Sequence, residues 1–394
     1  MQQAGWARSI GPLALVSLLG LATASAYTNH APLLPLLMQD LGFGPAPAGL
    51  LSTAFFLTAS VFIVPVGVLI DRLGPKPVGS AALATTTLGT LAMAAARDYT
   101  HLLVLKVVVG VAATSGFVAG VRYAGGLFRG GRGAIAQGIY GSATQVGSGV
   151  IISALPFIAE PYGWRAAYLA AAAFLFGATV LWWLAPPIAA NPGAPGGLAS
   201  ALRAPAGWLI GLVHTASYSV SIVVGTWAPT YLLREFALDL TTASQIGALV
   251  LLVGLVVRPL GGLIVGGHWL SAAALMRLAL GLNVAALALL AVPQRPLLVA
   301  LVAVVLLGVG CNLPYAPVYQ AAGAALPRNP GATTGLVAMV SFWGIMAGAP
   351  LVGWLVERTG GFGAAFGLLA VACLAVLAAT CTTTGRATLA VPIA

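Results

Sequence analysis

The 28 residues from Leu240 to Gly267 contain a single charged side chain, Arg258. A helix needs about 20 apolar residues to cross the hydrocarbon core of a bilayer, and this run is longer. Because lipid offers no hydrogen bonds to the backbone, such a run can fold in a membrane only as a helix. An arginine near the centre of that helix costs between about 3 and about 15 kcal/mol, so its charge requires compensation.

The same apolar pattern recurs along the whole chain. Hydrophobic residues make up 60% of the sequence and charged residues only 6%, against about 25% charged residues in soluble domains. Apolar runs of about 20 residues predict twelve spans, near residues 12–37, 48–70, 78–96, 102–125, 134–157, 165–185, 207–233, 243–266, 271–292, 297–322, 332–355 and 362–383. The predicted fold class is therefore an all-α polytopic membrane protein with twelve transmembrane helices.

The distribution of lysine and arginine predicts the orientation of these helices. An even number of spans places both termini on one side. With the termini in the cytoplasm, ten basic residues flank the spans inside and five outside, as the positive-inside rule requires. We therefore expect a multi-pass protein of the cell inner membrane with both termini cytoplasmic. A second interpretation of the first span stays open, because Ala24-Ser25-Ala26 imitates a signal-peptide cleavage site.

The chain also divides near its middle. The segment from Pro186 to Pro205 is rich in Pro, Gly and Ala, which is typical of a linker. We expect an N-terminal six-helix bundle over 1–185, a cytoplasmic linker over 186–206 and a C-terminal six-helix bundle over 207–394. An offset of 194 to 198 residues places Gly110 on Gly308 and Gly147 on Gly344. Because such matches keep their order along the half, a duplicated six-helix unit is predicted.

The charge of Arg258 has two possible explanations in the sequence. None of the twelve spans contains an acidic residue, so a buried ion pair has no evident partner. The guanidinium could bond carbonyl groups freed by Pro259, or extend to the membrane surface. Alternatively, its planar set of donors could bind a carboxylate or another oxyanion. The second explanation makes Arg258 an anion-binding residue.

Other polar and aromatic residues inside the spans are candidates for the same site. Asn312, Tyr315 and Tyr319 share one face of the tenth span. The further substrate-binding candidates are Tyr218, Asn29, His30, Gln145, Phe117 and Trp343. His30 and His214 are the only histidines well inside spans, and packing is favoured over proton transfer for both. Ordinary core packing is the alternative for every one of these residues.

Several functions are excluded by what the sequence lacks. It contains no phosphate-binding loop, no metal-ligand cluster and no nucleophile with a matching base, so we expect neither an enzyme nor a cofactor or metal. The net charge of +10 is spread between the spans, which argues against nucleic-acid binding. Because no span carries an acidic residue, anion exchange, uniport or symport is favoured over export coupled to a membrane-embedded carboxylate.

One loop carries a family resemblance. The segment Gly67-Val68-Leu69-Ile70-Asp71-Arg72-Leu73-Gly74-Pro75-Lys76 resembles the signature between helices 2 and 3 of the major facilitator superfamily. There Gly67 would allow close helix contact, Asp71 would accept from a helix N-terminus or an arginine, and Arg72 and Lys76 would hold the loop in the cytoplasm. Lys106-Val107-Val108-Val109-Gly110 is similar to the second motif of the family, where arginine is more common. The resemblance implies two six-helix bundles that alternate access to a central site, in a monomer.

Within that superfamily, Arg258-Pro259-Leu260-Gly261-Gly262 resembles the eighth helix of nitrate/nitrite porters. Oxalate/formate and monocarboxylate porters are similar in placing an arginine there. Nitrate porters carry a second arginine in helix 2, where this chain has Ile63-Val64-Pro65. They also carry glycine-asparagine signatures in helices 5 and 11, from which residues 138–145 and 335–344 depart. The resemblance implies a secondary transporter or antiporter of a small anion, either a short carboxylate or a nitrate-like oxyanion, bound by Arg258.

Two other functions stay open. The chain could export a neutral or amphipathic compound, in which case Arg258 is structural. It could also be a receptor or assembly protein that keeps a transporter fold without moving solute.

Overall fold

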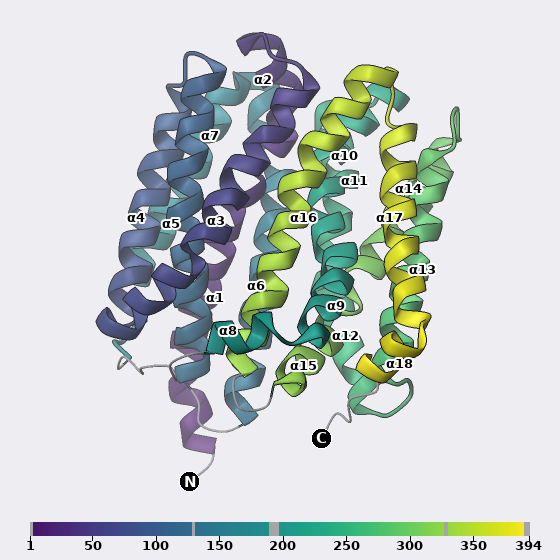
Figure 1. Ribbon diagram of the computed structural model, residues 1–394. Coiled ribbons are helices and arrows are strands. Elements are labelled where there is room, and N and C mark those ends of the chain that lie inside the picture. Colours follow the sequence, from purple (N-terminus) through teal and green to yellow (C-terminus); the bar gives the residue numbers. More distant parts are fainter. Residues whose placement is uncertain (1–2, 128–130, 189–196, 327–329, 390–394) are drawn as a thin grey trace. The chain divides into compact units, whose positions relative to one another are not determined.

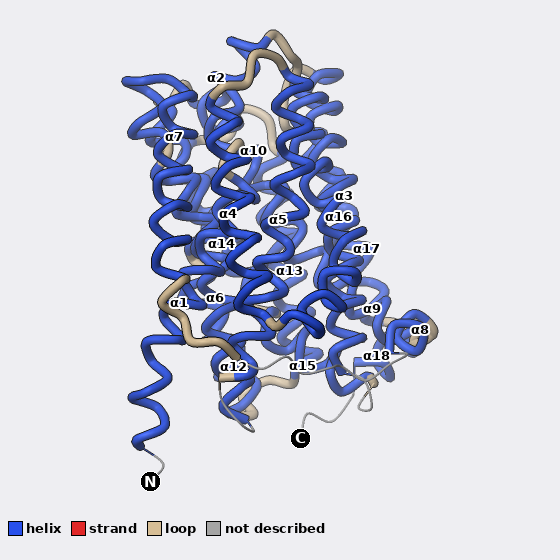
Figure 2. Tube along the Cα trace, turned by 90° about the vertical axis from the view of Figure 1, so that its left-hand side faces the viewer, coloured by secondary structure: helices blue, strands red, loops and turns tan. Residues whose placement is uncertain are grey.

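The computed structural model describes residues 3–127, 131–188, 197–326 and 330–389, and these residues form helices joined by short loops (Figures 1 and 2). Ten helical segments of the described chain are long and apolar enough to cross a membrane. Two further helices, α4 and α6, coincide with the predicted third and fifth spans but are less apolar, because they are rich in threonine or in glycine and serine. The prediction of an all-α membrane protein with twelve spans is confirmed.

The helices of the first half are α1 (Gln3–Thr28), η1 (Ala31–Leu33), α2 (Leu34–Leu41), α3 (Pro45–Leu73), α4 (Pro75–Ala94), α5 (Tyr99–Gly126), α6 (Gly131–Ala154) and α7 (Pro156–Trp182). Those of the second half are α8 (Gly197–Leu202), α9 (Pro205–His214), the π-helix η2 (Thr215–Ser219), α10 (Val220–Phe236), α11 (Leu240–Leu252), α12 (Gly254–Gly266), α13 (Ala272–Ala291), α14 (Leu297–Asn312), α15 (Tyr315–Ala325), α16 (Pro330–Thr359), α17 (Gly363–Cys381) and α18 (Thr383–Leu389).

The chain folds into two compact units. The first comprises Met1–Phe43, Ala54–Gly193 and Asp239–Gln245, and the second comprises Gly44–Thr53, Ala194–Leu238 and Ile246–Ala394. The first residues of α3 thus group with the second unit, and the first residues of α11 with the first. The predicted division into 1–185, a linker over 186–206 and 207–394 stays a prediction.

Large apolar side chains stand on the outside of both units. Leu88 of α4, Phe176 of α7 and Leu263 of α12 are each more than 60% exposed. Exposed apolar surface of this extent is unfavourable in water but is what a bilayer accommodates. These side chains therefore face lipid.

Glycines of the two halves occupy corresponding helix crossings. A Cβ added at Gly147 of α6 would overlap the backbone of Leu21 in α1. A Cβ added at Gly344 of α16 would overlap the side chain of Thr215 in η2. Gly147 thus lets α6 lie close to α1, and Gly344 lets α16 lie close to η2. The two crossings are related by the predicted offset, in agreement with a duplicated unit.

Most interruptions of the spans occur at or just before prolines. Helix α1 ends at Thr28. In a continuing helix the carbonyl of Thr28 would accept from the N–H of residue 32, and Pro32 has no N–H to donate. The α14–α15 break contains Pro314. The break between α11 and α12 at Val253 lies upstream of Pro259, where the sequence predicted a kink. These breaks leave carbonyl groups that need other donors.

The residues of the loop motif make few contacts in the structure, and the roles predicted for them stay predictions. Lys76 donates to the carbonyl of Trp183 at 3.1 Å, which joins the start of α4 to the end of α7. Arg72 is exposed. The close helix contact predicted at Gly67 is absent among the described residues, since a Cβ added there would have no neighbour within 4 Å. The side chain of Asp71 lies outside the described part of the chain.

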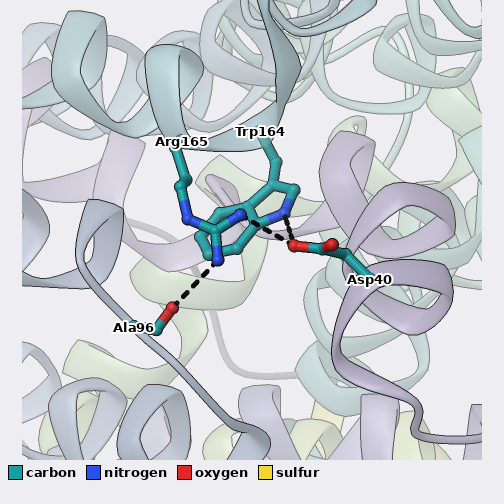
Figure 3. Close-up of polar contacts among 4 residues, drawn as sticks. All are labelled: Asp40, Ala96, Trp164 and Arg165. Carbon is teal, nitrogen blue, oxygen red and sulfur yellow. Dashed lines mark hydrogen bonds and ion pairs between the residues drawn. The ribbon is translucent and has the colours of Figure 1, made fainter.

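A polar cluster joins α2, α7 and the loop that follows α4 within the first unit (Figure 3). Asp40 at the end of α2 accepts hydrogen bonds from Trp164 Nε1 at 2.9 Å and from Arg165 Nη1 at 2.7 Å. Arg165 also donates to the carbonyl of Ala96, just beyond α4, at 3.4 Å. The side chains of Asp40 and Arg165 are about half exposed, so water screens the pair and it adds little stability. Its main effect is to position α2 against α7.

Candidate functional site

Arg258 is held by an asparagine of α14. Its Nε donates to Asn312 Oδ1 at 3.0 Å, and the two residues are 4% and 0% exposed. The amide nitrogen of Asn312 donates to the carbonyls of Gly308 at 2.8 Å and Val250 at 3.0 Å. Because two carbonyl acceptors define the position of the NH2 group, the oxygen of Asn312 must face Arg258. This contact fixes one edge of the guanidinium.

The sequence around Arg258 explains why this contact forms. Val250 lies in the last turn of α11, where the break at Val253 leaves carbonyls without helical donors. Asn312 supplies one such donor. A Cβ added at Gly261 would overlap the carbonyl oxygen of Leu313, so only glycine lets α12 lie this close to the end of α14. The glycine of the Arg-Pro-Leu-Gly segment therefore brings Arg258 within reach of Asn312.

An aromatic ring covers one face of the guanidinium. The central carbon of Arg258 lies 4.0 Å from the ring centroid of Tyr315. Such a cation–π contact stabilises a desolvated arginine by about 2 kcal/mol. The Tyr315 ring in turn packs on Tyr319, with 4.9 Å between centroids. Asn312 and Tyr315 together hold the plane of the guanidinium in one orientation.

A histidine joins this cluster from α9. His214 Nε2 lies 3.2 Å from the hydroxyl of Tyr319. Its ring stacks on Tyr218, with centroids 5.2 Å apart and planes only 9° apart. His214 is 2% exposed, and its Nδ1 is buried without a hydrogen-bond partner among the described residues. Arg258 lies within electrostatic range of this imidazole.

The π-helix η2 begins directly after His214. Its wider turns disturb the regular ladder of backbone bonds, and the carbonyl of Ala216 accepts from Asn283 Nδ2 at 3.0 Å instead. Short π-helical turns inside α-helices frequently occur at functional sites. This one carries Tyr218 and so places a ring of the cluster.

Access to the cluster is through its tyrosines. Tyr218, Tyr315 and Tyr319 are partly exposed, whereas Arg258 and His214 are buried. The neighbours that the structure shows around the guanidinium include one amide, three phenols, one imidazole and the thiol of Cys311. The arrangement therefore presents a single positive charge surrounded by groups that can donate or accept hydrogen bonds.

The first unit contains a second buried cation. Lys106 of α5 is 0% exposed, and its Nζ donates to Asn29 Oδ1 at 2.6 Å and to the carbonyl of Ala26 at 3.2 Å. Ala26 lies in the last turn of α1, whose carbonyls lack helical donors because of the break at Pro32. A cation at a helix C-terminus is also favoured by the helix dipole. Lys106 therefore caps α1.

The remaining substrate-binding candidates are described by the contacts that they make within their own units. In the first unit, Asn29 is engaged by Lys106, while His30 and Gln145 are buried. Phe117 packs on Tyr140 with 6.0 Å between ring centroids. In the second unit, Trp343 is 43% exposed and its ring lies 6.1 Å from that of Trp208. The roles predicted for these residues stay predictions.

Comparison with known proteins decides the family. A family model described as Major Facilitator Superfamily matches residues 16–329. The chain belongs to the Major Facilitator Superfamily. It is accordingly a multi-pass membrane transporter and not an enzyme.

The relatives of this superfamily member with similar sequences include nitrate transporters. The chain is 24% identical over 356 residues to a protein of Thermus thermophilus named "Probable nitrate/nitrite antiporter NarK1", covering 82% of this chain and 80% of the relative. It is 31% identical over 140 residues to the nitrate/nitrite transporter NrtP of Nostoc punctiforme, covering 35% of this chain and 27% of that one. The predicted resemblance to nitrate/nitrite porters is confirmed at this low level of identity.

Solved structures share the fold of this transporter. A mutant form of the nucleoside transporter NupG matches with a TM-score of 0.77 and 12% identity, over 96% of this chain and 99% of that one. A bacterial homologue of the human lysosomal transporter Spinster, inward-facing and occupied, matches with a TM-score of 0.72 and 16% identity, over 96% and 94% of the two chains. At these identities the likeness concerns the fold alone.

The structure adds His214 to the residues that the sequence selected around Arg258. The sequence favoured a packing role over proton transfer for this histidine. A usable signal was present, since His214 and Tyr218 are four residues apart and such residues are neighbours on a helix. The π-helix between them has no comparable signal in the sequence.

Proposed function

We propose that this transporter carries a small oxyanion, either nitrate or nitrite or a short carboxylate, and that Arg258 binds it. The observation that supports this proposal is the buried guanidinium that Asn312 and Tyr315 hold in one orientation. A positive charge in a membrane interior is costly, and a bound anion lowers that cost. The similarity to nitrate/nitrite transporters supports the same class of substrate.

The orientation of Arg258 suits a planar anion. Asn312 accepts from its Nε, and Tyr315 covers one face. A guanidinium held in this way keeps its plane, and a planar carboxylate or nitrate can accept two parallel N–H bonds from one edge. Preorganisation lowers the entropic cost of binding.

The same charge supports exchange as the transport mode. In alternating access the two six-helix bundles rock about a central site. An empty carrier has to change conformation with the positive charge of Arg258 in place, whereas an occupied carrier changes conformation with that charge neutralised. We therefore propose antiport of one anion against another, in agreement with the antiporter named among the relatives.

Uptake of radiolabelled nitrate and formate into liposomes tests the proposal. Wild-type protein is compared with Arg258→Ala, Arg258→Lys and Arg358→Ala, the last being an exposed arginine of the same unit that controls for net charge. Arg258→Ala should abolish uptake. Arg258→Lys should reduce kcat/KM about 100-fold or more, because an ammonium group cannot offer two parallel donors. Wild-type rates in both Arg258 variants would sink the proposal.

A ligand screen complements the uptake assay. Ligands that bind only the folded state raise its melting temperature. Nitrate, nitrite, formate and acetate should therefore stabilise the wild-type protein but not Arg258→Ala. Stabilisation by neutral solutes alone would instead support an exporter in which Arg258 is structural.

The distribution of basic residues supports the proposed orientation in the inner membrane, with both termini facing the cytoplasm. Membership of the superfamily supports a monomer. Cys381, near the C-terminus, is exposed, whereas Cys311 and Cys373 are buried. A membrane-impermeant maleimide should therefore label Cys381 in inverted vesicles and leave it unlabelled in intact spheroplasts. Labelling of intact spheroplasts would contradict the orientation.

A further inference from the structure

His214 occupies the centre of the aromatic cluster next to Arg258. Its ring stacks on Tyr218 and lies edge-on to Tyr319, with 5.1 Å between centroids. It also faces Tyr315 at 6.3 Å. One imidazole therefore contacts all three tyrosines through which the cluster is accessible, which makes it the best placed residue to act beside Arg258.

The two nitrogens of this imidazole differ in their surroundings. Nε2 is 3.2 Å from the hydroxyl of Tyr319, whereas Nδ1 is buried and has no hydrogen-bond partner in the part of the chain that the structure describes. Buried polar atoms of side chains are nearly always hydrogen-bonded, and an exception needs an explanation. Nδ1 of His214 therefore calls for a partner beyond the described residues, such as a bound ligand.

The hydrogen bond with Tyr319 determines whether Nδ1 of His214 carries a hydrogen. In the neutral ring one nitrogen has a hydrogen and the other has a lone pair. When the Tyr319 hydroxyl donates to Nε2, Nδ1 carries the hydrogen and becomes a buried donor. A donor without an acceptor, in electrostatic range of a guanidinium, is suited to an anion.

We propose that His214 is a second anion-binding residue of this transporter, with Nδ1–H donating to one oxygen of the anion while Arg258 binds the others. This inference rests on the proposed function and narrows its substrate class. An anion with two or more oxygens accepts from both residues at once, whereas a halide offers a single centre. The site therefore selects nitrate, nitrite or short carboxylates over chloride.

Two substitutions separate the roles of the two nitrogens. In His214→Asn the side-chain amide lies near the position of Nδ1, and in His214→Gln it lies near that of Nε2. The Gln variant thus keeps the contact with Tyr319 and loses the donor to the anion, while the Asn variant does the reverse. Tyr319→Phe keeps the ring and removes only the hydroxyl.

The variants are compared by nitrate and formate uptake and by chloride competition in the same liposomes. We expect His214→Gln to raise the KM for nitrate by roughly 10-fold to 100-fold, the effect of losing one hydrogen bond to a charged group. His214→Asn should stay within about threefold of wild type on the same scale. Inhibition by chloride should be unchanged in both, so the preference for nitrate over chloride falls only in the Gln variant.

The results separate this proposal from the proposed function. Wild-type KM in His214→Gln, with uptake lost in Arg258→Lys, would overturn the role of His214 and leave the role of Arg258 intact. A raised KM in His214→Asn alone would also overturn it, because His214 would then act by positioning Tyr319. Absence of anion uptake by wild-type protein would overturn both. If His214→Gln does not fold, the melting temperature of His214→Asn is the test. Nitrate should raise the melting temperature of this variant as it does that of wild type, and the absence of that rise would overturn the proposal.

Discussion

Each unit buries a cation that contacts an asparagine, and the two units treat that cation differently. Lys106 in the first unit donates to a backbone carbonyl and to Asn29, at the broken end of α1. Arg258 in the second unit donates to Asn312 and is covered by Tyr315. Both cations therefore lie beside an asparagine and a proline-associated break. In the described part of the chain these two cations differ in one respect: partly exposed tyrosine hydroxyl groups lie around Arg258 and not around Lys106.

This difference indicates which cation can take part in transport. An ammonium is a compact charge, and the oxygens of a helix end can satisfy it. A guanidinium is planar, and Asn312 and Tyr315 define its orientation without supplying a negative charge. We infer that Lys106 completes the fold of the first unit and that Arg258 is kept for a ligand.

Neutralising each cation gives the largest expected contrast. Arg258→Gln should lower kcat/KM for anion uptake about 100-fold or more, since the charge that binds the anion is removed. Lys106→Gln should leave kcat/KM within about threefold of wild type, because an amide can still donate to the α1 carbonyls. Uptake is measured in liposomes with protein amounts matched by quantified reconstitution. A loss in Lys106→Gln as deep as that in Arg258→Gln would remove the distinction between the two sites.

The structural role of Lys106 is tested by stability rather than transport. Lys106→Met removes the charge but leaves Asn29 Oδ1 and the Ala26 carbonyl without their donor. Each unsatisfied acceptor costs about 1–3 kcal/mol, so the melting temperature should fall. The double variant Lys106→Met/Asn29→Leu removes one of these acceptors and should recover part of the loss. If the double variant melts below the single one, the contact with Asn29 is not what makes Lys106→Met unstable.

Two neighbouring glycines offer a matched pair near Arg258. A methyl group at Gly261 would overlap the Leu313 carbonyl, whereas at Gly262 it would lie 3.5 Å from Ala316 Cβ, an ordinary contact. Gly261→Ala should therefore move α12 away from Asn312, lower stability by about 1–3 kcal/mol and raise the KM for the anion. Gly262→Ala should stay within about 0.5 kcal/mol of wild type in the same melting assay. Equal effects would show that the Arg258–Asn312 contact does not depend on close packing at Gly261.

The sequence predicts the fold well because the bilayer allows few structures. Apolar runs of sufficient length must become helices in lipid, so most of the spans follow from hydropathy, and only α4 and α6 are less apolar than the others. Breaks are harder to place. Pro32 interrupts its span, yet Pro229, its counterpart in the duplicated unit, lies inside the continuous helix α10. Local proline chemistry is the same in both, and packing around each helix decides the outcome.

The candidate site is predicted from the sequence only in its centre. Arg258, Asn312, Tyr315 and Tyr319 are found together because a charge and a polar face are conspicuous in an apolar chain. His214 joins them through a π-helix that no residue pattern announces. Asn29 is equally polar but serves Lys106. A polar residue in an apolar span therefore predicts a buried hydrogen bond. It does not predict whether the partner of that bond is a helix end or a ligand.

We expect acidic pH to lower the stability of the protein through the exposed helix-capping residue Asp239, and not through Lys106 or Arg258. Asp239 Oδ1 accepts from the backbone N–H of Thr242 at 2.7 Å at the start of α11, and this bond lowers the pKa of Asp239 below its usual value. Because its pKa is lower in the folded state, the carboxylate of Asp239 contributes its full stability above the ordinary pKa of about 4. This stability is lost as pH falls through the lower pKa of the folded state. The difference in melting temperature between wild type and Asp239→Asn should therefore be constant from pH 7 to 5 and shrink toward pH 3. This is the smallest effect expected, since the carboxylate is exposed. A difference that stays unchanged down to pH 3 would show that the charge of Asp239 does not stabilise the first turn of the helix that leads to Arg258.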